Sequence, residues 1–114
     1  MKIVEQNITL DEFEQMSKKM FGNLVKAVVD IEKGIMAVDA ELHSDEEAFL
    51  LENGSKQPNL WGINIYPELF GQADFIEFDS MIYLRPSQNN RSRGVDNLEI
   101  REKILEITNK LILK

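Results

Sequence analysis

The sequence predicts an α+β fold, with a single, mostly antiparallel sheet of about five strands and three helices in the order β-α-β-β-α-β-β-α. Three observations predict this class. Three segments combine a helix-start signal with apolar residues at helical spacing, the segments between them alternate between apolar and polar residues, and turn residues divide these alternating runs into pairs. Because 114 residues suffice for one core, we expect residues 1–114 to form a single domain.

The first two elements are a strand and a helix. Residues 1–7 alternate loosely, which predicts a short strand. Thr9 and Glu12 then form a capping box, in which each side chain satisfies a backbone N–H at the start of a helix. Apolar residues recur at helical spacing as far as Gly22, which can take the left-handed conformation that ends helices. We therefore expect a first helix between Thr9 and Gly22.

Residues 24–42 are predicted to form a β-hairpin. Apolar residues alternate with charged ones on both sides of Lys33-Gly34, a dipeptide typical of a turn. One face of the hairpin is apolar and the other is largely acidic. Antiparallel sheets often have this division, so we expect helices mainly on one face and water on the other.

Two further helices are predicted from capping boxes. Ser44 with Glu47 starts one, which should end near Asn53-Gly54. Asp96 with Glu99 starts the last one. Its predicted core stripe consists of four apolar residues, Ile100, Ile104, Ile107 and Leu111.

A second hairpin is predicted between these helices. Leu60–Tyr66 forms a strand candidate that ends at Pro67, and Trp61 in it is expected to fill the core. After a turn, Phe75–Leu84 predicts the longest strand of the chain.

Composition and charge limit the classes of function. The chain has no cysteine, which excludes disulfides and thiolate chemistry and fits a reducing compartment. No apolar run is long enough to span a bilayer and no secretory signal is visible at the start, so we expect a cytoplasmic protein without membrane insertion. The net charge of −7 disfavours non-specific binding to nucleic acid.

The segment 85–95 stands out because it is basic in an acidic chain. It contains three of the 13 basic residues and no acidic residue, which leaves 10 basic residues against 20 acidic ones elsewhere. Arginine binds phosphate or carboxylate oxygens with two hydrogen bonds, and Ser and Asn add neutral donors. The segment therefore predicts an anion-binding site made of Arg85, Ser87, Asn90, Arg91, Ser92 and Arg93.

The alternative role for these arginines is structural. They would pair with surplus carboxylates of the chain itself and fasten an irregular loop to the sheet. The candidate partners are Asp39, Glu41, Glu77 and Asp79.

A second pattern consists of carboxylates and one histidine on predicted strands. Side chains on adjacent strands lie about 5 Å apart, close enough to share a divalent cation through oxygen ligands. Such a cation, for example Mg²⁺, would assist phosphoester cleavage, with His43 as a base and Arg85 orienting the phosphate. The candidate ligands are Asp39, Glu41, His43 and Asp79. The charged face of an antiparallel sheet is the plainer interpretation of the same pattern.

Several stretches look familiar together. They are Val38–His43, Trp61–Pro67, Glu77–Ile82, Arg85–Gln88 and Asn90–Arg93. Through them, nearly the whole chain resembles a family of small prokaryotic proteins known only as a domain of unknown function. This resemblance implies a stand-alone prokaryotic domain and brings no activity that transfers to a residue.

Three hypotheses about function follow. The first is a small binding module whose loop at 85–95 accepts an anion such as the phosphate of a nucleotide or nucleic acid. The second is a metal-assisted phosphoester hydrolase that uses the sheet carboxylates. The third is a structural or protein-interaction domain that forms a homodimer. The sequence leaves open whether the chain is an enzyme.

Overall fold

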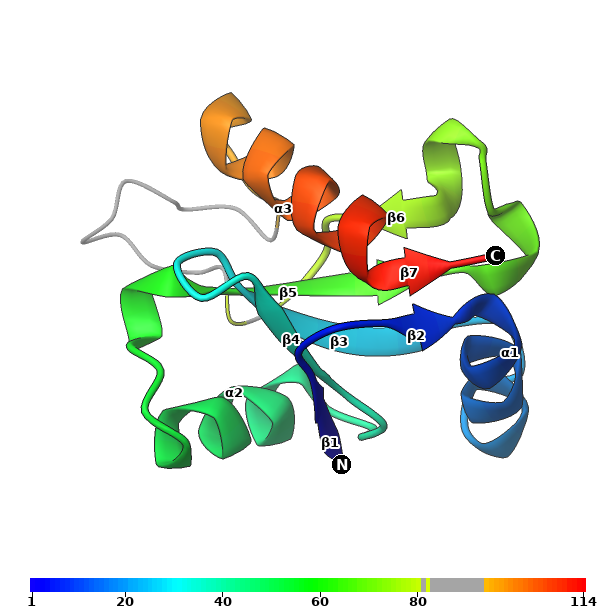
Figure 1. Cartoon of the computed structure of the whole chain (residues 1–114), viewed down its shortest axis with the longest axis horizontal. Helices are drawn as coiled ribbons and strands as arrows, with labels where there is room; N and C mark the ends of the chain where they lie inside the picture. The colour runs from blue at the N-terminus through cyan, green and yellow to red at the C-terminus, as the bar shows by residue number, and fades with distance from the viewer. Residues whose placement is uncertain (81, 83–93) are drawn as a thin grey trace.

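The computed structural model describes residues 1–80, 82 and 94–114. Its main sheet has five antiparallel strands in the order β1-β4-β3-β5-β6, and a second, parallel pair joins β2 to β7 (Figure 1). The strands are β1 (Lys2–Val4), β2 (Ile8–Thr9), β3 (Val25–Asp30), β4 (Ile35–Val38), β5 (Leu60–Ile65), β6 (Ile76–Glu77) and β7 (Ile112–Leu113). The helices are α1 (Leu10–Lys19), α2 (His43–Glu52) and α3 (Leu98–Leu111), with short 3-10 helices at Gln57–Asn59, Pro67–Leu69 and Ala73–Phe75. The predicted α+β class is confirmed.

The first predicted hairpin is confirmed as β3 and β4, and a buried carboxylate builds its turn. Asp30 Oδ1 accepts hydrogen bonds from the backbone N–H of Glu32 at 2.9 Å and of Lys33 at 3.0 Å. The other carboxylate oxygen accepts from the Ser55 hydroxyl at 2.7 Å. Asp30 therefore shapes the turn and ties it to the segment that follows α2.

The sheet is covered on both faces, which corrects the expectation of a wet face. Helices α1 and α3 contribute Phe13, Met16, Ile104 and Leu111 to the larger core cluster on one face. Helix α2 lies on the opposite side of the sheet from α3, and its Leu50 packs in a second cluster (Figure 1). That second cluster consists of Val28, Ala37, Leu50 and Leu60. Apolar residues such as Val28 interrupt the polar face, and α2 covers them.

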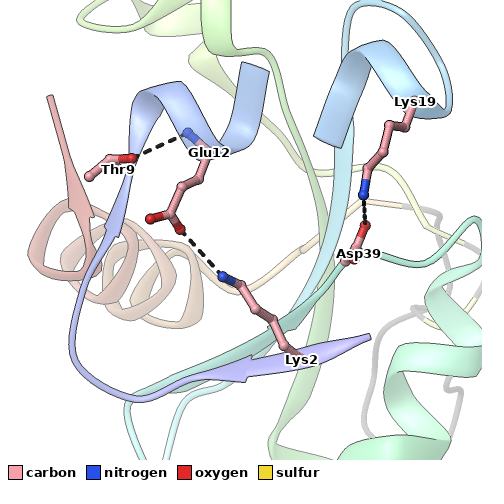
Figure 2. Close-up of polar contacts among 5 residues, drawn as sticks. All are labelled: Lys2, Thr9, Glu12, Lys19 and Asp39. Carbon is pink, nitrogen blue, oxygen red and sulfur yellow. Dashed lines mark hydrogen bonds and ion pairs between the residues drawn. The ribbon is translucent and has the colours of Figure 1, made fainter. Parts of the chain in front are cut away.

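The N-termini of the three helices were predicted with mixed success. The Thr9 cap of α1 is confirmed, because its hydroxyl accepts from the N–H of Glu12 at 3.2 Å (Figure 2). The Glu12 side chain, which the capping box would turn back to the helix start, instead accepts from Lys2 Nζ at 3.3 Å (Figure 2). The capping boxes at Ser44 and Asp96 are wrong. Helix α2 has Leu42 at its N-cap and no side-chain cap, and Asn97 caps α3 by accepting from the N–H of Glu99 at 2.8 Å.

The second predicted hairpin forms, but its outer strand is short. Strand β6 pairs with β5 only at Asn64–Glu77 and Ile65–Ile76. The described residues 78–80 have no regular secondary structure, so the long strand predicted from residue 75 does not form there. Ser80 gives a local reason, because its Oγ accepts from the N–H of Ile82 at 3.3 Å, a local bond that competes with strand pairing.

The pair β2 and β7 was not predicted. It joins Ile8 to Ile112 and Thr9 to Leu113, beside the larger core cluster (Figure 1). Within the described residues, no helix has the length and apolar character that crossing a membrane requires.

Candidate functional site

A cleft opens where α2 begins, on the face of the sheet that α2 covers. Its volume is about 490 Å³, which lies within the range of small-molecule sites. Four apolar side chains line it, Phe21, Leu24, Leu42 and Ile82. Seven polar ones complete the lining, Lys26, His43, Ser44, Asn64, Glu77, Asp79 and Ser80.

His43 is fixed at the inner wall of this cleft. Its side chain is buried, and Nε2 lies 2.8 Å from the carbonyl oxygen of Ile63 on β5. Since a carbonyl only accepts, Nε2 carries a hydrogen and donates it. The β5–β6 ladder ends at Asn64, so His43 binds β5 just beyond that ladder. Strand β5 therefore sets both the position and the tautomer of this histidine.

Gly62 makes room for His43 and Ser80 on the sheet. A Cβ atom at residue 62 would stand 2.8 Å from Ser80 Oγ and 3.0 Å from His43 Cγ. Both distances are shorter than side-chain packing normally allows. The cleft wall therefore favours glycine at this position of β5, because a larger residue would force His43 or Ser80 to move.

The side of the cleft near α2 is electropositive. Lys26 is half-buried on β3, and its Nζ lies 5.3 Å from the centre of the Phe21 ring. Among the described residues, no carboxylate lies within 4.0 Å of that ammonium group. The first turn of α2, from which His43 and Ser44 line the cleft, has no side-chain cap. The start of α2 and the Lys26 ammonium group, which has no carboxylate partner among the described residues, thus face the same cleft.

The opposite side carries hydrogen-bond acceptors. Asn64 Nδ2 donates to Glu77 Oε1 at 2.8 Å and to the backbone oxygen of Asp79 at 3.4 Å. The Tyr66 hydroxyl also donates to Glu77 Oε1, at 3.0 Å. Partial burial of this hydroxyl and its bond to Glu77 raise the pKa of Tyr66. Asn64 Oδ1 has no hydrogen-bond partner among the described residues.

Glu46 lies one turn after His43, beneath the start of α2. It is 0% exposed, and neither carboxylate oxygen makes a hydrogen bond of regular geometry within the described chain. Burial raises the pKa of Glu46 to about 10, although the Ala40 backbone and the charge of Lys26 act in the other direction. Glu46 is therefore neutral at pH 7 and leaves the charge of Lys26 uncompensated.

The four predicted metal ligands lie in different surroundings. His43 and Asp79 both line the main cleft. Asp39 follows β4 with a φ of 71° and pairs with Lys19 at 3.8 Å beside a smaller cleft (Figure 2). Glu41 is exposed and lines neither cleft. In the part of the chain that the structure describes, no three His, Asp or Glu side chains are grouped to hold a metal ion.

The predicted anion-binding residues Arg85, Ser87, Asn90, Arg91, Ser92 and Arg93 lie outside the described residues. The alternative in which these arginines pair with internal carboxylates lies outside them as well. On the C-terminal side of this segment the chain is anchored, because Val95 is buried and its carbonyl accepts from Arg101 Nε at 2.7 Å.

Sequence reasoning missed several residues of the cleft. Gly62 and Asn64 stand in the otherwise apolar run of β5, where a glycine often marks a close approach and a polar residue needs a reason. Glu46 stands near the start of a predicted helix, where acidic residues are common, yet it shares a buried helix face with His43 and Leu50. Lys26 gave no signal of its own, because alternating strands commonly carry lysine.

Comparison with known proteins gives a family and no activity. Residues 2–111 match the model of a family described as "Protein of unknown function (DUF5674)". No match was found among the curated proteins or among the solved structures. The match spans nearly the whole chain, and the protein therefore belongs to the DUF5674 family.

Proposed function

We propose that this protein is a binding module that holds an anionic ligand, such as the phosphate of a nucleotide, in the cleft at the start of α2. One observation carries the proposal. The uncapped first turn of α2 and the ammonium group of Lys26, which has no carboxylate within 4.0 Å among the described residues, face the same cleft.

Electrostatics favours an anion on this side. The start of a helix carries roughly half a positive charge, and its backbone N–H groups point out of the helix end. Lys26 adds a full charge, and the Ser44 hydroxyl adds a donor at the cleft surface. Of the two acidic residues in the first turn, Asp45 is exposed to solvent and Glu46 is neutral at pH 7, so the positive field is only partly offset.

The carboxylates of the opposite side do not cancel this preference. Glu77 already accepts hydrogen bonds from Asn64 and Tyr66, which compensate part of its charge. The cleft is thus bipolar, with a positive side formed by Lys26 and α2 and an acceptor side formed from β5 and β6. A ligand that places its anion beside α2 satisfies this arrangement.

Calorimetry with inorganic phosphate and with adenosine monophosphate tests the proposal. We expect binding that weakens with added salt and is lowered roughly tenfold by Lys26→Met, which removes the charge. Lys18→Met is the matched control, because Lys18 is exposed on α1, does not line the cleft and changes the net charge equally. Failure of the wild type to bind either compound, or equal losses in the two variants, would refute the proposal.

The arginines of segment 85–95 are a separate part of the hypothesis. The proposal that Arg85, Arg91 and Arg93 receive the anion rests on composition alone. A prokaryotic origin and a cytoplasmic location likewise stay predictions from the sequence.

A further inference from the structure

The acceptor side of the cleft contains an oxygen that the protein leaves without a donor. Asn64 is 7% exposed, and its Oδ1 is enclosed and has no hydrogen-bond partner among the described residues. Buried polar atoms are nearly always paired, because an unpaired one loses its hydration without compensation. An unpaired amide oxygen in the wall of a ligand-sized cleft is therefore a feature that a ligand would complete.

The orientation of Asn64 follows from its partners. Its amide nitrogen faces Glu77 Oε1 and the backbone oxygen of Asp79, both of which only accept. The amide oxygen therefore points away from β6 and toward β3. There Lys26 is the direct cross-strand neighbour of Asn64 on the same face of the sheet. Lys26 places its ammonium group over the Phe21 ring, so it leaves Oδ1 unpaired.

We infer that the cleft is specific for a ribonucleotide whose ribose hydroxyls donate hydrogen bonds to Asn64 Oδ1 and Glu77, an assignment that rests on the proposed anion-binding function. The phosphate lies beside Lys26 and the start of α2. Ligand binding then turns the Lys26 ammonium group from the Phe21 ring to the phosphate, which exposes the face of the ring, and it gives the ribose access to the enclosed Oδ1.

The apolar side of the cleft would hold the base of such a nucleotide. Phe21 is 42% exposed and Leu42 is 53% exposed, and both line the cleft. An exposed aromatic ring beside a polar site offers a surface on which a flat base stacks. The three sides of the cleft thus match phosphate, ribose and base. Inorganic phosphate engages only the first of them.

Three ligands separate this inference from the proposed function. Calorimetry would compare inorganic phosphate, adenosine monophosphate and 2′,3′-dideoxyadenosine monophosphate. We expect the ribonucleotide to bind about tenfold more tightly than its dideoxy analogue, because loss of the donors leaves a buried acceptor unpaired. Equal binding of the two nucleotides overturns the inference while leaving anion binding intact. Absence of binding by all three compounds overturns both.

Two variants test whether Asn64 causes the preference for the ribonucleotide over its dideoxy analogue. In Asn64→Leu, which preserves shape and removes the amide, the preference for the ribonucleotide should fall below about twofold. Tyr66→Phe is the matched control, because it removes the other donor to Glu77 from a residue that does not line the cleft, and it should keep the preference. A preference that persists in Asn64→Leu refutes the role of Asn64. If that variant does not fold, the comparison of the two nucleotides on the wild type still tests whether the cleft prefers a ribonucleotide.

Discussion

His43 lies directly against Gly62, so that a Cβ atom at residue 62 would stand 3.0 Å from His43 Cγ. The same histidine donates to the carbonyl of the next residue, Ile63, at 2.8 Å. Close packing and a hydrogen bond therefore join the start of α2 to the centre of β5. This junction forms the inner wall of the candidate ligand cleft.

Replacing Gly62 by alanine should destabilise the fold. The added methyl group would meet Ser80 Oγ at 2.8 Å and the His43 ring at 3.0 Å, and overpacking of this kind costs about 1–3 kcal/mol. Urea unfolding monitored through Trp61 would measure the loss. In a Gly62→Ala/Ser80→Ala double variant, part of the loss should be recovered, because the closest contact is removed. Strict additivity of the two single substitutions would show that Ser80 does not crowd a side chain at residue 62.

Glu46 should make stability depend on pH. The folded protein keeps the Glu46 proton up to about pH 10, whereas a glutamate in the unfolded chain loses it near 4.5. Between these values folding takes up a proton, so stability falls as the pH rises, by about 1.4 kcal/mol per pH unit. Glu46→Gln removes this slope and should therefore gain stability relative to the wild type from pH 6 to pH 9.

Unfolding curves at several pH values would check the Glu46 prediction. Glu52→Gln serves as control, because Glu52 is exposed on the same helix. Parallel stability profiles for the wild type and Glu46→Gln would contradict the assignment of a neutral carboxyl group.

Asp30 should be important for stability but not for binding. Asp30→Ala removes the acceptor for two backbone N–H groups and for the Ser55 hydroxyl, a loss of about 3 kcal/mol. Asp30→Asn retains one acceptor oxygen for the turn, so its free energy of unfolding should fall by less than that of Asp30→Ala. Neither Asp30 nor Ser55 lines the main cleft. The affinity for phosphate, measured at a temperature where the variants are folded, should therefore be unchanged. A lowered affinity in folded Asp30→Asn would connect this turn to the site.

The basic segment gives a prediction that depends only on charge. An Arg91→Ala/Arg93→Ala variant should bind phosphate compounds more weakly than the wild type and with a shallower dependence on salt. Lys103→Ala/Lys110→Ala on the exposed side of α3 removes the same charge and is the control. Equal affinity in the arginine variant and the wild type would assign these arginines to another role.

The metal hypothesis has its own test. If Asp79 and His43 contribute to a cation site, millimolar Mg²⁺ or Mn²⁺ should raise the unfolding temperature, and Asp79→Asn should abolish that rise. An unfolding temperature that neither cation changes would remove the hydrolase hypothesis, and it would leave the anion-binding proposal untouched.

Local signals predicted most of the fold. The alternation of apolar and charged residues on both sides of Lys33-Gly34 identified β3 and β4. The Thr9 cap identified the start of α1. Both signals arise from residues that are close together in the sequence. The capping boxes at Ser44 and Asp96 failed because the backbone entered each helix at a different residue, Leu42 or Asn97. The two-sided core was missed because the covering of Val28 and Ala37 by α2 is a tertiary relationship.

The cleft was only partly predictable for the same reason. His43 and Asp79 were selected from the sequence, although for metal binding, and they do line the cleft. Asn64 and Lys26 become neighbours through strand register, which the separate segments do not encode in an obvious way. Glu46 looks like an ordinary helix-start glutamate until packing buries it.

The parallel contact between β2 and β7 has a consequence for biosynthesis. Ile8 and Ile112 are far apart in the sequence, so this pairing forms only after residue 112 has been synthesised. The larger core, to which both isoleucines belong, therefore depends on a contact between distant parts of the sequence. Deletion of β7 should therefore impair maturation more than a change of similar size in the exposed turn at Gly71.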